Sequence, residues 1–185
     1  MSDELPEGTD FIDMEGLAFT PEEHERLKSL LHGEKFKQIA YSDQRYLVLG
    51  AGGTDEKSSR PLSIYDILGN RPNSISFRLE DFGLISDEIA LWAAAYENLC
   101  ETATHIVLVI EDYEGDYVWE MGYLYHSTIR KKVWALQRDY GSEKENRKRY
   151  NNGMAASHLR LLLNADRTFR WEDSNELKEK TENIP

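Results

Sequence analysis

The run HIVLVI at residues 105–110 constrains the fold of this chain more than any other segment. His105 is followed by five apolar residues, four of them β-branched, with no polar residue among them. A strand with one solvated face alternates apolar and polar residues, whereas a strand buried on both faces reads as a continuous apolar run. The segment therefore indicates an inner strand of a parallel sheet that helices cover on both sides.

Strand and helix patterns alternate along the rest of the chain. Further strands are predicted at residues 75–82, 131–137 and 168–172, the last of them an edge strand, and residues 45–53 are predicted as a buried strand followed by a tight turn. Helices are predicted at residues 20–33, 63–69, 87–103 and 153–165, another opens near residue 117, and a polar loop occupies residues 138–152. This alternation predicts an α/β sandwich whose sheet has about four or five mostly parallel strands.

The ends of the chain differ from its middle. Thr20, Pro21 and Glu23 form a capping-box sequence that opens the first helix. We expect an N-terminal extension with one helix at residues 1–44, an α/β domain at residues 45–172 and a polar C-terminal tail at residues 173–185.

Charge and composition exclude several classes of function. The net charge is −12 and the pI about 4.9, so the surface repels nucleic-acid polymers. The five histidines lack H-x-x-x-H or H-E-x-x-H spacing and Cys100 is the only cysteine, so no metal site is predicted. No segment approaches the roughly 20 apolar residues that span a bilayer, and the acidic N-terminus differs from a secretory signal. We therefore expect a cytoplasmic protein without a membrane partner.

Glycines follow the first predicted strand, in the sequence RYLVLGAGG. Their spacing does not give the G-x-G-x-x-G pattern of dinucleotide-binding folds, because Asp55 takes the third position. Ligands of parallel α/β sheets bind outside the carboxyl ends of the strands, so Gly50, Gly52 and Gly53 are candidate ligand contacts. A plain tight turn explains the same glycines.

The sequence EDYEGDYVWEMGYLY at residues 111–125 places acidic side chains at the same edge. Asp116 is a candidate N-cap, which puts Glu120 in the first helical turn, where exposed amides stabilise a negative charge. Gly122 costs roughly 1 kcal/mol of helix stability relative to alanine, which indicates close approach of a ligand or another backbone. Trp119 is interpreted as core packing. Glu120 is either a catalytic carboxylate or a support for the helix start.

The segments HIVLVIED, GDYVWEMGYLY and KKVWALQRD together resemble nucleoside 2-deoxyribosyltransferases and their relatives. In that family a buried strand ends in acidic residues, and the next helix opens with glutamate, an apolar residue, glycine, and tyrosine or alanine. The resemblance covers residues 95–140 closely and 45–53 loosely. TIR-type NAD-cleaving domains share a similar layout and an essential glutamate. The resemblance implies a flavodoxin-like three-layer sandwich, here with an N-terminal helical extension.

The same resemblance implies roles for individual residues. Glu120 would attack the anomeric carbon of a ribosyl or deoxyribosyl group, as the nucleophile of a retaining glycosidase does. Asp112 would hold sugar hydroxyls or protonate the leaving base, and Tyr123 would orient the Glu120 carboxylate. Asn152 would complete a substrate pocket, across a subunit boundary as in the family, or only cap the following helix. The other expected substrate contacts are Gly50, Gly52, Gly53, Asp116 and Gly122.

We therefore expect cleavage or (deoxy)ribosyl transfer at the N-glycosidic bond of a nucleoside or nucleotide, without a cofactor, by a homo-oligomeric enzyme. Two departures from the family support an alternative. His105 stands where the family often has an acidic residue, and Tyr46 begins the first strand, although the family has an aromatic residue near its end. The alternative is a non-catalytic nucleotide-binding or signalling and defence module of the same fold.

Overall fold

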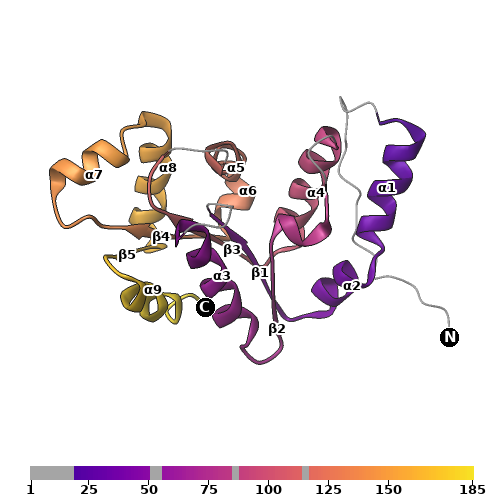
Figure 1. Ribbon diagram of the computed structural model, residues 1–185, viewed down its shortest axis with the longest axis horizontal. Helices are drawn as coiled ribbons and strands as arrows, with labels where there is room; N and C mark the ends of the chain where they lie inside the picture. Colours follow the sequence, from indigo (N-terminus) through magenta and orange to yellow (C-terminus); the bar gives the residue numbers. More distant parts are fainter. Residues whose placement is uncertain (1–18, 51–55, 85–87, 114–116) are drawn as a thin grey trace.

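The sheet contains five parallel strands in the order β2-β1-β3-β4-β5, which is the strand order of flavodoxin-like folds (Figure 1). The structure is a computed structural model that describes residues 19–50, 56–84, 88–113 and 117–185. The strands are β1 (Gln44–Leu49), β2 (Ser74–Phe77), β3 (His105–Ile110), β4 (Val133–Arg138) and β5 (Thr168–Trp171). The predicted α/β sandwich is confirmed, and each pair of neighbouring strands is parallel.

The helices connect these strands and flank them. They are α1 (Pro21–Leu31), α2 (Glu34–Tyr41), α3 (Glu56–Gly69), α4 (Ile89–Thr102), α5 (Tyr117–Leu124), α6 (Ser127–Arg130), α7 (Glu143–Arg149), α8 (Gly153–Asn164), α9 (Ser174–Thr181) and the 3-10 turn η1 (Leu79–Phe82). Among the described residues, no helix combines the length and the apolar character needed to cross a bilayer.

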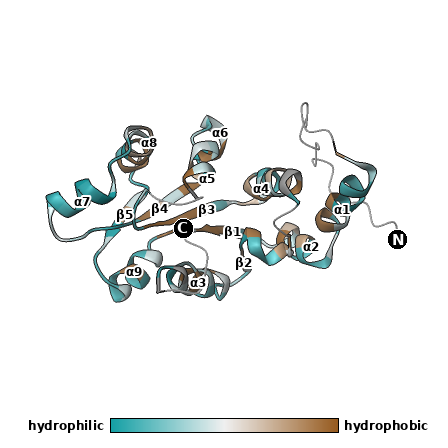
Figure 2. Ribbon diagram, turned by 45° about the horizontal axis from the view of Figure 1, so that its top comes forward, coloured by the Kyte–Doolittle hydropathy of each residue, from teal (hydrophilic) through white to brown (hydrophobic). Residues whose placement is uncertain are grey.

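Two apolar clusters lie on the two faces of the sheet. Helices α4, α5, α6 and α8 cover one face, and α3 and α9 cover the other (Figure 2). Along β3, Leu108 and Ile110 pack into the first cluster, and Val107 and Val109 pack into the second. All four are at most 3% exposed, so the burial on both faces that the apolar run predicts is confirmed.

The N-terminal helices pack against the α/β domain. The predicted capping box opens α1: Thr20 Oγ1 accepts from the Glu23 amide at 3.2 Å, and Glu23 Oε2 accepts from the Thr20 amide at 2.8 Å. Leu27 of α1 is buried in the cluster that contains α4. The prediction of one helix is wrong, because α2 begins directly after Gly33 and buries Ile39 completely.

The helix predicted at residues 63–69 is longer than expected, because α3 begins at Glu56 and contains Pro61. Proline lacks an amide donor and usually ends a helix, so the pattern alone places the helix start after it. In the fold, Pro61 packs on the end of β1: a Cβ atom added to Gly50 would lie 2.6 Å from Pro61 Cγ. Pro61 therefore lies inside α3 and against the end of β1.

Two further boundaries differ from the sequence prediction. The strand predicted at residues 75–82 ends at Phe77, because Asp81 Oδ2 accepts from the Arg78 amide at 2.9 Å and closes η1. The polar loop predicted at residues 138–152 contains α7, whose first turn is capped by the Ser142 hydroxyl. In both segments a polar side chain bonds to a nearby amide, which favours a helical turn.

The polar tail predicted at residues 173–185 is wrong, because this segment forms α9 and packs against α3. Leu177 and Ile184 are 1% and 2% exposed. Arg71 donates to the carbonyl oxygens of Ile184 at 2.7 Å and Thr181 at 3.0 Å. A few apolar side chains in a polar segment are enough to dock a helix when a complementary surface is present.

Leu177→Ala tests the contribution of α9 to the core. We expect the free energy of unfolding to fall by about 2–4 kcal/mol, because the change removes buried carbon atoms and leaves a cavity. Urea denaturation followed by circular dichroism measures it. Lys178→Ala, at the neighbouring exposed position, is the control and should change the free energy by less than about 0.5 kcal/mol. Equal effects of the two substitutions would contradict the packing of α9.

Candidate functional site

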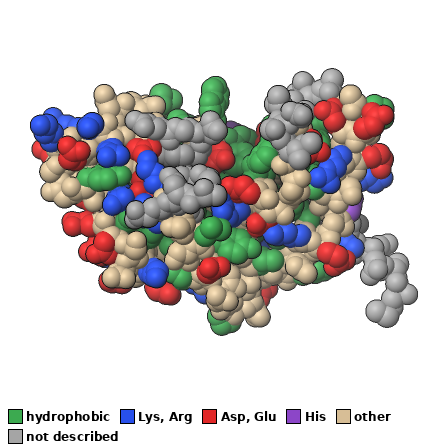
Figure 3. Space-filling view, viewed as in Figure 1, with side chains coloured by type: hydrophobic (Ala, Val, Ile, Leu, Met, Phe, Trp, Pro, Cys, Tyr) green, Lys and Arg blue, Asp and Glu red, His purple; other side chains and the backbone are tan. Residues whose placement is uncertain are grey.

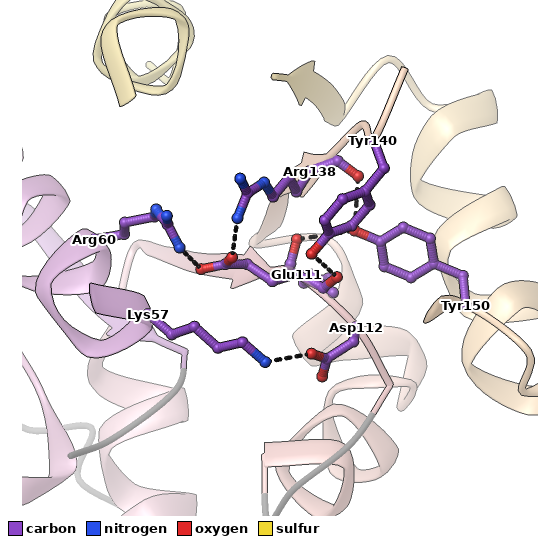
Figure 4. A network of polar contacts seen from close by, with 8 residues as sticks. Lys57, Arg60, Glu111, Asp112, Arg138, Tyr140 and Tyr150 are labelled. Carbon is purple, nitrogen blue, oxygen red and sulfur yellow. Dashed lines mark hydrogen bonds and ion pairs between the residues drawn. The ribbon is translucent and has the colours of Figure 1, made fainter. Parts of the chain in front are cut away.

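The carboxyl ends of β1 and β3 form the switch point of the sheet, where the crossover after β1 passes over one face and the crossover after β3 over the other. Ligands of open α/β sheets bind in the crevice at this point. Glu111 and Asp112 follow β3 directly and are only 6% and 3% exposed. Buried carboxylates require partners, and α3, which follows β1, supplies cations to both (Figure 4).

Glu111 is held between two arginines. Arg60 Nη1 of α3 lies 2.5 Å from Glu111 Oε1, and Arg138 Nη1 at the end of β4 lies 2.7 Å from Glu111 Oε2. The two guanidinium groups also lie 5.6 Å and 5.4 Å from the ring centroid of Trp171 in β5. The carboxylate therefore joins α3 to the ends of β3 and β4, next to β5.

Two tyrosines fix the backbone beside this carboxylate (Figure 4). The Tyr140 hydroxyl donates to the Glu111 carbonyl oxygen at 2.8 Å, and the Tyr150 hydroxyl donates to the Arg138 carbonyl oxygen at 2.7 Å. The Arg138 guanidinium lies 4.9 Å from the Tyr140 ring centroid. These contacts fix the positions of the ends of β3 and β4 relative to one another.

Asp112 points toward α3, where Lys57 Nζ lies 2.7 Å from its Oδ2 atom (Figure 4). The hydrogen bond to Asp112 raises the pKa of Lys57 above its ordinary value, although partial burial opposes the rise. An ion pair of this kind favours the charged forms of both partners. Asp112 is therefore suited to accept hydrogen bonds at neutral pH.

Glu120 lies in the first turn of α5, as predicted, and its side chain is half-buried. The Tyr96 hydroxyl of α4 donates to the Glu120 carbonyl oxygen at 2.9 Å. Burial raises the pKa of Cys100 in α4 to about 12, and the charge of Glu120 acts in the same direction. These interactions place Glu120 on the side of α5 that faces α4, whereas Asp112 contacts α3.

Tyr123 lies three residues beyond Glu120 and also faces α4. Its ring meets the Tyr96 ring edge-on, with 5.5 Å between the centroids. Burial raises the pKa of Tyr123 to about 12, and the charges of Glu97 and Glu101 on α4 contribute to the rise. The orientation of Glu120 by Tyr123 stays a prediction.

The structure describes three of the predicted substrate contacts. Gly50 is explained by protein packing, because an added Cβ would meet Pro61 and Val109 of the chain itself. An added Cβ on Gly122 would meet no atom of the described residues within 4 Å, so packing does not require glycine there. Asn152 Oδ1 accepts from the Met154 and Ala155 amides and caps α8. The other three predicted contacts, Gly52, Gly53 and Asp116, lie outside the described residues.

Trp119 is 86% exposed, so its interpretation as core packing is wrong. Met121 and Leu124 form the buried side of α5. At 100° per residue, Trp119 and Gly122 fall on the opposite, solvent-facing side.

The two departures from the family lie at the opposite, amino-terminal edge of the sheet. Tyr46 and His105 are partners in the β1–β3 register, and their rings stack with 5.2 Å between the centroids. The Tyr46 hydroxyl donates to the Pro185 carbonyl oxygen at 2.8 Å. Both aromatic side chains therefore contribute to packing far from the acidic strand end.

Sequence reasoning placed Arg60 and Arg138 near the cleft but gave them no partner, and it assigned no individual role to Lys57, Glu111, Tyr140 or Tyr150. One signal was present for Glu111: it directly follows the buried run and precedes Asp112, so a buried charge at the strand end was foreseeable. The contacts of Lys57 and Arg60 with the two carboxylates gave no signal, because both cations stand in a segment that reads as turns. Their partners are 51 or more residues away along the chain.

The described residues contain no group of three or more His, Cys, Asp or Glu side chains placed to hold a metal ion. No family model, curated protein or solved structure matches the chain. The chemistry of the acidic strand end and of Glu120 is therefore the basis for any assignment of function.

Glu111→Gln tests whether the acidic strand end organises the sheet edge. The change removes one charge from a buried network and leaves Arg60 and Arg138 facing an uncharged amide. We expect the free energy of unfolding to fall by about 3–5 kcal/mol. Glu143→Gln, in the exposed Glu143–Arg147 pair, is the control and should cost less than about 0.5 kcal/mol in the same urea titration. A loss no larger than that of the control would show that the network contributes nothing.

His158 of α8 is a second buried polar group near α5. It is 2% exposed, neither ring nitrogen has a hydrogen-bond partner among the described residues, and its ring meets the Tyr125 ring edge-on. Burial lowers the pKa of His158 to about 4, and the charge of Arg130 contributes to the lowering. The folded protein therefore holds this imidazole neutral well below the pH at which an unfolded chain protonates it.

This lowered pKa predicts a stability that depends on pH. Between pH 6.5 and about pH 4 the unfolded chain binds a proton at His158 that the folded chain excludes, so stability falls as the pH falls through this window. The loss in free energy of unfolding reaches on the order of 3 kcal/mol at the acidic end of this window. His158→Phe should remove this contribution. The free energy of unfolding of the variant minus that of the wild type should therefore increase from pH 7 to pH 4. A difference independent of pH would contradict the burial of a neutral histidine.

Proposed function

We propose that this protein cleaves, or transfers the sugar across, the N-glycosidic bond of a nucleoside or nucleotide, with Glu120 as the nucleophile. One observation carries the proposal: a buried, ion-paired aspartate follows β3 at the switch point, and a half-buried glutamate stands in the first turn of the next helix. The resemblance to nucleoside 2-deoxyribosyltransferases supports the same two residues.

The environment of each carboxylate suits a different role. Lys57 favours the ionised form of Asp112, so Asp112 is better suited to accept hydrogen bonds from sugar hydroxyls than to protonate the leaving base. Glu120 lies in the first turn of α5, where the helix dipole favours the negative charge that a nucleophile requires. We therefore assign sugar binding to Asp112 and bond formation to Glu120.

The reaction proceeds in two displacements. A Glu120 carboxylate oxygen bonds to the anomeric carbon, while the electron pair of the carbon–nitrogen bond leaves with the base, which takes up a proton from solvent. Water then attacks the glycosyl ester, releases the sugar and regenerates the Glu120 carboxylate. If a second base attacks in place of water, the product is a new nucleoside.

The alternative is a module of the same fold that binds a nucleotide without cleaving it. One observation favours it: the three cations at the strand end, Lys57, Arg60 and Arg138, each pair with a carboxylate of the protein. The sole effect of such a network can be to make the edge of the sheet rigid, without any part in catalysis. The two functions differ in whether any base is released.

Base release from deoxynucleosides, nucleoside monophosphates and NAD, followed by chromatography, tests the proposal. Glu120→Gln should lower the rate at least about a hundredfold while the protein stays folded, because the amide cannot form the ester. Asp112→Asn should raise KM and lower kcat/KM roughly tenfold or more, because a charge-assisted acceptor for the sugar is lost.

Glu179→Gln is the matched control, since Glu179 is an exposed glutamate of α9, on the face of the sheet opposite α4 and α5. It should retain the rate of the wild-type protein. Activity in Glu120→Gln equal to that of Glu179→Gln would exclude Glu120 as the nucleophile. No release of base from any substrate by the folded wild-type protein would favour the binding module.

A further inference from the structure

One segment of this acidic protein carries the opposite charge. Residues 138–170 contain eight Lys and Arg against four Asp and Glu, whereas the whole chain has a net charge of −12. Part of this charge lies in the last turn of α7, at Arg147, Lys148 and Arg149, and Figure 3 shows Lys and Arg side chains gathered at the α7 end of the molecule. A local excess of cations on an anionic protein attracts small anions to that end.

A groove of about 580 Å³ lies within this segment, between α8 and the ends of β4 and β5. Polar side chains that line it include Gln137, Ser157, Arg160 and Arg170. Its volume falls within the range of about 300–1,000 Å³ that holds small-molecule ligands.

The sequence of α8 explains why the groove is open. Gly153, Ala156 and Ser157 are small residues at helical spacing on the side of α8 that lines the groove. The strand register pairs Gln137 of β4 with Arg170 of β5, so their side chains point to the same face of the sheet. The small residues of α8 therefore leave space above a polar patch of the sheet.

The two arginines of the groove are available to a ligand. Arg170 is 61% exposed, and its one ion pair among the described residues is a long one, at 3.8 Å from Asp139. The Asp139 carboxylate already accepts from the Gly141 amide at 2.9 Å and from Asn146 Nδ2 at 2.8 Å. Arg160 is exposed on α8 and takes part in none of the ion pairs of the described residues.

An apolar and aromatic wall completes the groove. Tyr113 and Tyr150 line it, and their rings meet edge-on with 5.1 Å between the centroids. The hydrogen bond from the Tyr150 hydroxyl to the Arg138 carbonyl oxygen holds that ring in place. Leu159 and Leu163 of α8 add aliphatic surface. The groove thus combines cations with a preformed apolar wall, which is the composition of a binding site for an organic anion.

We propose that this groove binds a small organic anion, with a phosphate or carboxylate group at Arg160 and Arg170 and an aromatic or aliphatic body against the tyrosines and leucines. The groove adjoins the acidic strand end through Tyr150, but it lies on the α8 face of β4 and β5, whereas Lys57 and Arg60 of α3 lie on the other face. The proposal does not depend on the glycosidic chemistry of Glu120.

Isothermal titration of the full-length protein with phenyl phosphate tests the proposal, with benzyl alcohol as the neutral analogue and inorganic phosphate as the anion without a ring. Phenyl phosphate should bind more tightly than either, because only it engages both parts of the groove. Arg160→Gln and Arg170→Gln should each weaken binding at least about tenfold, since each removes a charge-assisted contact.

Two further variants make the result specific. Arg147→Gln makes the same change of charge on α7, outside the groove, and should leave the affinity within about twofold. Ser157→Trp fills the groove from an exposed position of α8 without a change of charge, and should abolish binding while circular dichroism shows an intact fold. The proposal is overturned if phenyl phosphate does not bind to the wild-type protein. It is overturned equally if Arg147→Gln weakens binding as much as Arg160→Gln, or if Ser157→Trp has no effect.

Discussion

The buried carboxylate of Glu111 is the interaction on which the carboxyl edge of this sheet depends. Parallel strands end at one edge, and the backbone there leaves the ladder of hydrogen bonds that holds the strands together. Glu111 bridges Arg60 of α3 and Arg138 of β4, so that a crossover helix and two neighbouring strand ends share one network. The free-energy cost of removing the Glu111 carboxylate from water is offset only because each of its two oxygens has a cationic partner.

The rest of the candidate site is arranged around this network. Asp112 is the next residue and is turned toward Lys57, one turn before Arg60 on α3. Tyr140 holds the Glu111 backbone through a hydrogen bond to its carbonyl oxygen. A shift of Glu111 would therefore displace Asp112, the next residue, from Lys57. The network thus fixes the position of the Asp112 carboxylate at the end of β3.

The edge of the sheet also separates two environments on its two faces. On the α3 side, Glu111 and Asp112 pair with cations. On the α4 side, Glu120 and Tyr123 lie near Tyr96, Cys100 and the glutamates of α4. Farther along the edge, the groove beside α8 has exposed arginines in place of buried ones. Charged groups therefore differ between the two faces of the sheet, and between buried and exposed positions. The net charge of the whole chain does not reveal these differences.

The main features of the fold could be predicted from the sequence wherever a pattern is local and strong. The apolar run of β3 identified an inner parallel strand, and the capping box of α1 identified a helix start, because both signals depend on neighbouring residues alone. The pattern failed in residues 173–185, where a few apolar side chains dock α9 on α3, a partner far along the chain. It also failed at the end of β2 and in α7, where local side-chain caps favour helical turns.

The sequence by itself determined the succession of the five strands along the chain, the burial of β3 and the place of Glu120 in the first turn of its helix. Periodicity and capping are properties of short segments, so the chain carries this information in consecutive residues. Only the tertiary structure decided that Lys57 meets Asp112, that Glu111 lies between two arginines, and that Trp119 faces solvent. These outcomes depend on how the crossovers bring α3 and β4 to the end of β3, and no short segment of sequence encodes that geometry.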